Sequence, residues 1–356
     1  MSLPARPRMR DLARALGVSQ ATISNAFHRP DQLSEELRQR ILTAARNAGY
    51  AGPDPLANTF RKGRTGAVGL IVHKPLQYLF EDQAAQLTMS GVARACGEHG
   101  SSLVLVPRAE PTHPDIVSSA LVDGFVAFCD PLEPARRELI RSRRLPVVGL
   151  DAPITAGKPF VGIDDSSAAR TAATHIAALG HRRIGVICFR LSPDRPPGPV
   201  EEGLTVATAY AANRARLQGY RDGLAPVLAA GAQVTVVAAD GVSEQDGASA
   251  AGALLDRADR PTALLVMGDR LALGAIAQAR SMGIDVPRQL SVVGFDDVPA
   301  AAAATPALTT ISQPHVDKGA CAIHLLLSSE PAPVSRLLPT RLVVRASTAP
   351  PSQQRG

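Results

Sequence analysis

The sequence has 356 residues, enough for two or three domains, and with 3% aromatic residues and no Trp their cores must rely on Ala, Val, Leu and Ile. No apolar run is long enough to span a bilayer, and the N-terminus lacks the apolar core of a secretion signal. The net charge of +6 belongs entirely to residues 1–65, which hold eleven Lys or Arg and five Asp or Glu. We expect this segment to bind a polyanion such as DNA, although a solvated basic tail would carry the same charge.

Residues 9–27 predict two short helices joined by a tight turn. Apolar residues recur at helical spacing up to Gly17, where the chain must turn. Ser19 is a candidate N-cap for the second helix, which turns Ile23 and Phe27 inward. Its outward residues are small or polar and suit a helix in the DNA major groove: Gln20, Ala21, Ser24, Asn25 and His28. The alternative is a small helical subdomain with an ordinary solvated face.

A third helix is expected from Ser34, which is a candidate N-cap followed by two glutamates in the positive first turn. Its apolar stripe can pack over the first two helices and close a three-helix headpiece.

The linker at residues 51–66 predicts a helix of barely two turns over residues 56–61, between Pro55 and Gly63. A helix that short is marginal in water, and its basic neighbours indicate that DNA holds it. Phe60 is a large apolar residue in this polar linker. It either packs against a neighbouring domain or wedges into a minor-groove base step.

From residue 67 onward, short apolar runs alternate with Ala-rich amphipathic segments, which predicts parallel sheets covered by helices on both faces. The first set of strands is residues 67–72, 102–106, 124–128 and 146–150, and the second is residues 161–163, 183–187, 234–237, 263–267 and 291–295. Two sets indicate two doubly wound subdomains, with chain crossings near residues 159–162 and 309–314. A last strand at 340–344 follows a helix at 316–327, and Pro-rich residues 191–203 are expected to form an exposed flexible loop.

The chain closely resembles the lactose-repressor/galactose-repressor (LacI/GalR) family of bacterial transcription regulators. The resemblance covers roughly residues 9–348. It rests on LARALGVSQATISNAF, GRTGAVGLIV, LGHRRIGVI, RLQGYRDGL, ALLVMGDRLALGAIAQARSMGIDVPRQLSVVGFDD, PALTTISQP and LPTRLVVRAST, which occur in this order. It implies an all-α helix-turn-helix headpiece plus an α/β periplasmic-binding-protein-like core of two doubly wound parallel-sheet subdomains.

The resemblance also implies a division of the chain. The expected parts are a headpiece at 1–50, a hinge helix at 51–65, an effector-binding and dimerisation core at 66–348 and a tail at 349–356. Within the core we expect an N-subdomain of about 66–160 plus 312–330 and a C-subdomain of about 161–311 plus 331–348. The short polar tail has no leucine heptad, which favours a homodimer over the family's tetramer.

For DNA contacts, the resemblance implies base reading by Gln20, Ala21 and Asn25. It implies phosphate contacts by Ser19, Thr22, Ser24 and Ser34, and minor-groove contacts by Ala57 and Phe60 in the hinge. Asn25 stands where the family commonly has Arg. Because Asn favours adenine and Arg favours guanine, we expect a half-site that differs from the common family sequence.

An effector site is expected outside the carboxyl ends of the strands. Asp151 and Asp296 end strands of the two lobes, and Arg216 opens a helix. Two carboxylates and a guanidinium suit a polyhydroxylated ligand such as a sugar. His73, Lys74, Gly268, Asp269 and Arg270 lie at the expected rim. Asp269 is an effector ligand or a cap of the following helix, and Lys74 with Arg270 leaves a sugar phosphate or another acid open.

These features predict an effector-responsive DNA-binding regulator, a repressor that binds a pseudo-palindromic operator as a dimer and senses a small sugar-like metabolite. A solute-binding protein with the same core is the alternative, but it would need export. No nucleophile–base, P-loop or dinucleotide motif is present, so we expect neither an enzyme nor a cofactor. The four cysteines are far apart and form no CxxC pair, which favours a cytoplasmic protein without a metal site.

Overall fold

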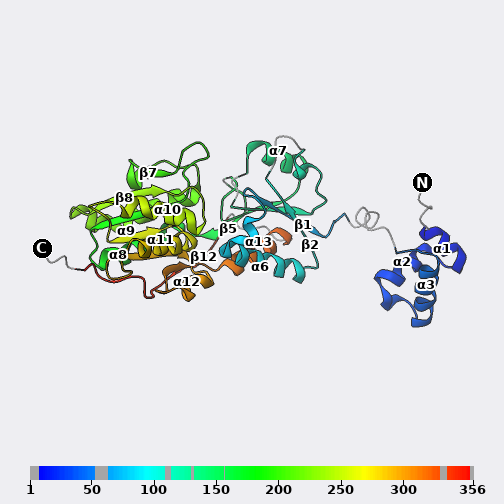
Figure 1. Cartoon of the computed structure of the whole chain (residues 1–356). Coiled ribbons are helices and arrows are strands. Elements are labelled where there is room, and N and C mark those ends of the chain that lie inside the picture. Colours follow the sequence, from blue (N-terminus) through cyan, green and yellow to red (C-terminus); the bar gives the residue numbers. More distant parts are fainter. Residues whose placement is uncertain are drawn as a thin grey trace, which may run out of the picture. The chain divides into compact units, whose positions relative to one another are not determined.

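The computed structural model describes residues 8–52, 63–108, 114–129, 132–155, 157–328 and 335–352. The chain divides into two compact units, Met1–Gly66 and Ala67–Gly356, which are described separately below (Figure 1).

The first unit is a three-helix headpiece of α1 (Met9–Leu16), α2 (Gln20–His28) and α3 (Glu35–Asn47), with a 3-10 turn at Pro30–Gln32. Gly17 ends α1 with a left-handed φ of 66°. Ser19 and Ser34 cap the next two helices, because their hydroxyls accept hydrogen bonds from the amides of Thr22 (3.0 Å) and Leu37 (3.3 Å). The helices enclose one apolar core of Leu12, Ala13, Ile23, Ala26, Ile41, Ala45 and Tyr50. The predicted headpiece is therefore confirmed.

The second unit contains two lobes, and the first is built on a parallel sheet. Its strands are β1 (Ala67–Val72), β2 (Ser102–Val106), β3 (Gly124–Phe128), β4 (Val147–Leu150), β5 (Phe160–Ile163) and β12 (Ser335–Leu338), in the order β12-β5-β4-β3-β1-β2. Helices α6 (Gln83–Glu98) and α13 (His315–Leu327) cover one face, and α7 (Pro134–Ser142) covers the other (Figure 1). Two short helical pieces, α5 (Tyr78–Glu81) and a 3-10 turn at Ile116–Ser118, complete this lobe.

The second lobe is a seven-stranded sheet. Its strands are β6 (Arg183–Cys188), β7 (Gly198–Val200), β8 (Gln233–Ala238), β9 (Ala263–Val266), β10 (Ser291–Asp296), β11 (Thr309–Ser312) and β13 (Arg341–Val343), in the order β13-β11-β10-β9-β6-β8-β7. The edge strands β7 and β13 are antiparallel to their neighbours, and the five inner strands are parallel. One face carries α8 (Asp165–Ala178) and α9 (Ala211–Ala229), and the other carries α10 (Glu244–Leu255) and α11 (Asp269–Ser281). A 3-10 turn lies at Gly203–Thr205, and a short helix, α12, spans Pro299–Ala303.

The predicted boundary between the lobes is wrong for two strands. Residues 161–163 belong to β5 of the first sheet, where Phe160 pairs with Gly149 of β4, and not to the second lobe. Within the predicted C-subdomain segment 331–348, β12 also joins the first sheet, beside β5, and only β13 reaches the second. A short apolar run predicts that a strand is buried but not which sheet provides its partner. The chain therefore crosses between lobes after Ile163, after Ser312 and after Leu338.

The expected loop at residues 191–203 contains a strand instead. Within it, β7 pairs antiparallel with β8, and Leu191 and Val200 are buried. Pro199 is tolerated because an edge strand leaves one side of its backbone without a ladder partner.

Three helix pairs in the second unit approach closely enough that only glycine fits between them. A β-carbon on Gly91 of α6 would overlap the carbonyl oxygen of Val316 on α13. The same holds for Gly219 against Ser166 and for Gly274 against Glu244 in the other two pairs. Among the helices of the described ranges, none is long and apolar enough to cross a membrane.

Candidate functional site

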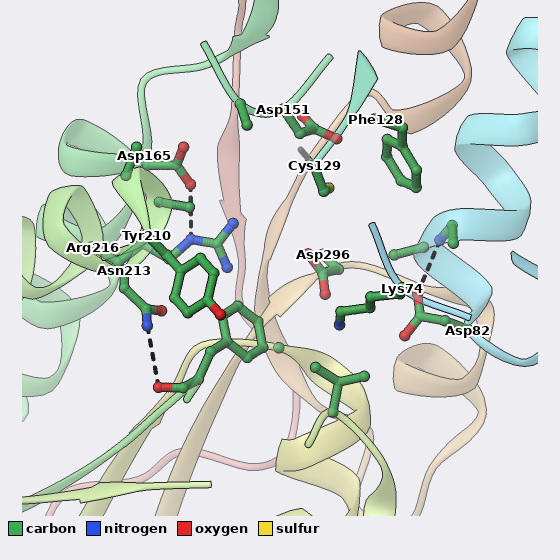
Figure 2. Close-up of a pocket in the computed structure, with 18 of the residues that line it drawn as sticks. Lys74, Asp82, Phe128, Cys129, Asp151, Asp165, Tyr210, Asn213, Arg216 and Asp296 are labelled. Carbon is green, nitrogen blue, oxygen red and sulfur yellow. Dashed lines mark hydrogen bonds and ion pairs between the residues drawn. The ribbon is translucent and has the colours of Figure 1, made fainter. Parts of the chain in front are cut away.

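A cavity of about 490 Å³ is lined by residues from both lobes of the second unit (Figure 2). Its walls include the residues that follow or end the strands: His73 after β1, Cys129 after β3, Asp151 after β4, Gly268 after β9 and Asp296 at the end of β10. Carboxyl ends of parallel strands therefore meet at one place, as the strand pattern predicts.

Arg216, on α9, is fixed in the cavity wall by three contacts. Its Nε donates to Asp165 Oδ1 (2.8 Å), and its Nη1 donates to the carbonyl of Met267 (2.6 Å). The guanidinium also stacks on Phe295, with Cζ 3.7 Å from the ring centre. Figure 2 shows Arg216 beside Asp165, with Asp296 between Arg216 and Lys74. The sequence did not identify Asp165, because its pairing with Arg216 requires α8 and α9 to pack together.

A polar chain joins the two lobes through residues of the second crossing. Lys318 Nζ donates to Asp151 Oδ1 (2.6 Å) and to Gln313 Oε1 (2.8 Å), and Gln313 Nε2 donates to Asp296 Oδ1 (2.7 Å). Burial and the neighbouring Asp269 carboxylate raise the pKa of Asp296, while Arg216 and Lys318 oppose the rise. The two strand-ending carboxylates are therefore linked, but through Gln313 and Lys318, which sequence reasoning missed. The sequence signal that could have identified Gln313 and Lys318 was their position at or just after the predicted crossing at 309–314.

His315 also contacts this chain of hydrogen bonds, at Asp296. Its Nε2 donates to the carbonyl of Asp296 (3.0 Å), and its Nδ1 lies 3.4 Å from the Thr88 hydroxyl. Burial, and then the charge of Lys318, lowers the pKa of His315 to about 4.

His73 and Lys74 line the first-lobe wall. Burial and the nearby cations Lys74 and Arg108 lower the pKa of His73 to about 4, and its buried Nδ1 has no hydrogen-bond partner among the described residues. The Lys74 ammonium lies 4.3 Å from the centre of the Tyr78 ring. On the second-lobe wall, Asn213 Nδ2 donates to the carbonyls of Phe189 (3.1 Å) and Arg190 (2.9 Å). Its buried Oδ1 has no partner in the described part of the chain.

Asp269 does not have either of its predicted roles. It is fully buried and does not line the cavity, which corrects the prediction of an effector contact. Its carboxylate accepts from the Val298 amide (3.0 Å) and from the Thr310 hydroxyl (2.5 Å) rather than capping α11. Asp269 therefore ties the start of α11 to the neighbouring strands, and burial raises its pKa to about 6.

The headpiece residues chosen for DNA contact are mostly accessible. Ser19, Gln20, Ala21 and Ser34 are exposed, and Thr22 is half-buried. Asn25 is half-buried and donates to Gln32 Oε1 (3.1 Å). Ser24 is only 6% exposed, which corrects its predicted phosphate contact: it lies three residues before Phe27, on the side that packs inward. Ala57 and Phe60 of the predicted hinge lie outside the described residues.

Two further observations limit the chemistry of the cavity. Among the described residues, no group of three His, Cys, Asp or Glu side chains could hold a metal ion. Cys129 lines the cavity, but burial raises the pKa of its thiol far above the usual range, so the reactive thiolate is disfavoured. The described lining is suited to binding a polar ligand.

Comparison with known proteins matches both units. Residues 8–52 match the model for bacterial regulatory proteins of the lacI family, and residues 173–348 match a periplasmic binding protein-like domain. The chain is 39% identical over 354 residues to an HTH-type transcriptional regulator of Mycobacterium tuberculosis, covering 98% of each chain. It is 31% identical to the HTH-type transcriptional repressor CytR of Escherichia coli, covering 96% of each. The solved structure of a transcriptional regulator CelR–cellobiose complex is 27% identical, with a TM-score of 0.65, over 96% of this chain and 100% of that one.

Proposed function

We propose that this chain, which belongs to the LacI family of bacterial regulatory proteins and is a DNA-binding transcriptional regulator, is a cytoplasmic repressor. It binds a pseudo-palindromic operator as a homodimer and is switched by a small sugar-like metabolite. The observation that carries the proposal is the joining, in one chain, of a basic helix-turn-helix unit to a two-lobed core with a polar cavity.

In the headpiece, α2 would be the reading helix. We assign base contacts to Gln20, Ala21 and Asn25, and phosphate contacts to Ser19, Thr22 and Ser34. The Ser19 and Thr22 hydroxyls lie 2.8 Å apart at the start of α2, where a helix N-terminus favours a phosphate. The net charge of +6 in residues 1–65 supplies the attraction to the DNA backbone. Ala57 and Phe60 remain the proposed minor-groove contacts of the hinge.

In the core, a polyhydroxylated ligand suits the hydrogen-bond acceptors of the residues that line the cavity. Asp296, the Oδ1 of Asn213 and the Nδ1 of His73 can accept hydrogen bonds from hydroxyl groups. Asp151 lines the first-lobe wall and is held by its ion pair with Lys318. Arg216 lines the second-lobe wall and is held by its ion pair with Asp165. The CelR relative is solved with cellobiose, which supports a sugar as the ligand class.

The switch would act through the polar chain that links Asp151 to Asp296. A ligand that contacts both lobes competes for or reinforces these hydrogen bonds, and so changes the angle between lobes. In a dimer this change alters the spacing of the two hinges and shifts the balance between DNA-competent and incompetent states.

A solute-binding protein would use the same core and is the second candidate. The helix-turn-helix unit, with its exposed polar residues on α2, favours the regulator, since solute capture has no use for it.

Selection of bound DNA from random sequence, repeated with a panel of sugars, tests the proposal. We expect a two-fold-related sequence to be enriched, and one sugar to change the yield. Gln20→Ala should relax the preference at one base pair and weaken binding about tenfold, whereas Gln39→Ala, an exposed residue of α3, should have no effect. Enrichment that persists after removal of residues 1–64, or no enrichment at all, would contradict the regulator mechanism.

A further inference from the structure

The charged side chains that line the cavity are not balanced. Three cations have partners: Arg216 pairs with Asp165, Lys318 with Asp151, and Arg190 with Asp240. Three more basic residues line the same cavity without an ion pair among the described residues: Lys74, Arg214 and Arg270. Arg214 is exposed and donates to the carbonyl of Thr208, so Lys74 and Arg270 are the two that need a partner.

Lys74 and Arg270 come from opposite lobes. Lys74 follows β1 of the first lobe, and Arg270 lies in the first turn of α11 in the second. Both side chains line the cavity. Burial lowers the pKa of Lys74 and the charge of Arg270 adds to this, while Asp82 and Asp246 act in the opposite direction. Two like charges on facing walls hold the lobes apart unless something negative lies between them.

The remaining carboxylates of the cavity cannot supply that negative charge in full. Asp82 is buried and caps α6 by accepting from the Ala85 amide (2.9 Å), so the helix N-terminus already compensates it. Asp296 accepts from Gln313, and burial with the Asp269 carboxylate raises its pKa, which favours its neutral form.

We propose that the effector carries an acidic group, a phosphate monoester or a carboxylate, which binds between Lys74 and Arg270 and allows the two lobes to close on it. The inference rests on the proposed function for the existence of an effector and adds its charge. The hydroxyl-binding wall around Asn213 and Asp296 would hold the rest of the molecule, so the ligand class is a polyol bearing one acidic group.

Calorimetry with matched probe pairs tests the charge directly. The pairs are glucose with glucose 6-phosphate, ribose with ribose 5-phosphate, and glucose with glucuronate, so that phosphate and carboxylate are separated. Thermal unfolding in inorganic phosphate tests the acidic group alone. We expect at least one acidic probe to bind tenfold or more tightly than its neutral parent, and phosphate to raise the Tm.

Substitutions then locate the acidic group. Lys74→Met and Arg270→Gln should each reduce the affinity for the acidic probe tenfold or more and remove the phosphate effect on Tm. Arg288→Gln, on the same lobe as Arg270 with a side chain 85% exposed, should change neither. Lys74→Met should also raise the Tm of the unliganded protein, since it removes a half-buried charge that has no ion pair among the described residues; a misfolded variant would show the opposite.

Equal or tighter binding of the neutral parents overturns the proposal, as does a panel in which no acid binds and phosphate leaves the Tm unchanged. Operator binding without effector is measured on the same samples. The same measurement is repeated with each probe present. Absence of operator binding both without and with the probes would overturn the proposed function, while the probe affinities still decide the charge of the ligand.

Discussion

Lys318 and Lys74 are two lysines of one cavity in opposite situations. Lys318 is 1% exposed and donates to Asp151 and Gln313, whereas Lys74 has no carboxylate within ion-pair distance among the described residues. Asp151 is held next to Lys318 with a left-handed φ of 61°, a conformation that non-glycine residues adopt at a cost. The ion pair therefore compensates a buried charge and fixes a strained residue at once.

Lys318→Met should destabilise the core by about 3 kcal/mol, because it leaves Asp151 without its partner in a largely buried site. Urea unfolding of the whole chain measures the loss. Lys158→Met, at an exposed position, is the control and should stay within about 0.5 kcal/mol of the parent. A neutral outcome for Lys318→Met would mean that solvent already screens Asp151.

His315 predicts how stability depends on pH. Its pKa is lowered to about 4 in the folded chain, chiefly by burial and then by Lys318, against 6.5 when unfolded. The unfolded state therefore binds a proton first, so the stabilising contribution is complete above pH 6.5 and is lost as pH falls toward 4. Between pH 7.5 and pH 5 the loss from this residue is about 2 kcal/mol.

His315→Gln should flatten that dependence, as measured by urea unfolding at the two pH values. His73, with its pKa also lowered to about 4, changes stability in the same direction, and Asp269, with its pKa raised to about 6, changes it in the opposite one. Only the difference between parent and variant therefore isolates His315. An unchanged slope would show that His315 takes up its proton at the same pH in the folded and unfolded chains.

At the scale of elements, helix pairs on the sheet faces depend on glycines that place backbone against backbone. On α6, Gly91 packs against the backbone of α13 at Val316, while Gly97, two turns further on, has open space beside it. The same helix therefore contains a site where a methyl group cannot fit and a site where it can.

Gly91→Ala should destabilise the protein by about 3 kcal/mol, since the new methyl group must push α13 away from α6. Gly97→Ala should instead stabilise it by up to about 1 kcal/mol through the helix preference of Ala. Thermal unfolding of both variants checks the sign of each change. Equal effects at the two positions would indicate that the helices readjust freely.

The positions of most helices and strands could be predicted from the sequence, but the sheet that each strand joins could not. The headpiece helices, their serine caps and the apolar strands from β1 to β10, except the edge strand β7, were predicted, because capping and apolar runs are local signals. The strand β11 was predicted only as a chain crossing, and β12 was not predicted as a strand. The sheet that β5 and β12 join was not predicted, because that depends on neighbours far along the chain. Pro199 likewise indicated a loop where an edge strand tolerates it.

The residues of the candidate site were likewise predicted only in part. Asp151 and Asp296 were predicted because strand ends of parallel sheets meet at one edge. Lys318, Gln313 and Asp165 were missed, because each is defined by a partner on another element. Asp269 has the position expected of a ligand contact, but the packing of α11 turns its carboxylate toward Val298 and Thr310.

At the scale of the molecule, the two lobes are linked by crossings that carry part of the cavity lining. Gln313, just after the second crossing, joins Asp296 of one lobe to Lys318 and so to Asp151 of the other. A change in the angle between the lobes therefore has to stretch or shorten this chain of hydrogen bonds.

Gln313→Ala should break the chain without removing a charge. We expect the lobes to open, seen as a larger radius of gyration in solution scattering of the unliganded protein. Effector affinity should fall about tenfold, within the usual size of coupling energies. Affinity of the unliganded protein for operator should change by less than the effector affinity does. Gln289→Ala, at an exposed position of the second lobe, is the control. Unchanged scattering would show that packing, rather than the chain, sets the angle.

The third crossing has a consequence for how the protein is made. Both lobes take a strand from the last residues, β12 at Ser335–Leu338 and β13 at Arg341–Val343, so each sheet keeps an unpaired edge until those residues leave the ribosome. The three headpiece helices are synthesised first and need none of them. A nascent chain, or one cut short by a stop codon near residue 330, would thus contain a complete DNA-reading unit joined to a core in which both sheets lack an edge strand.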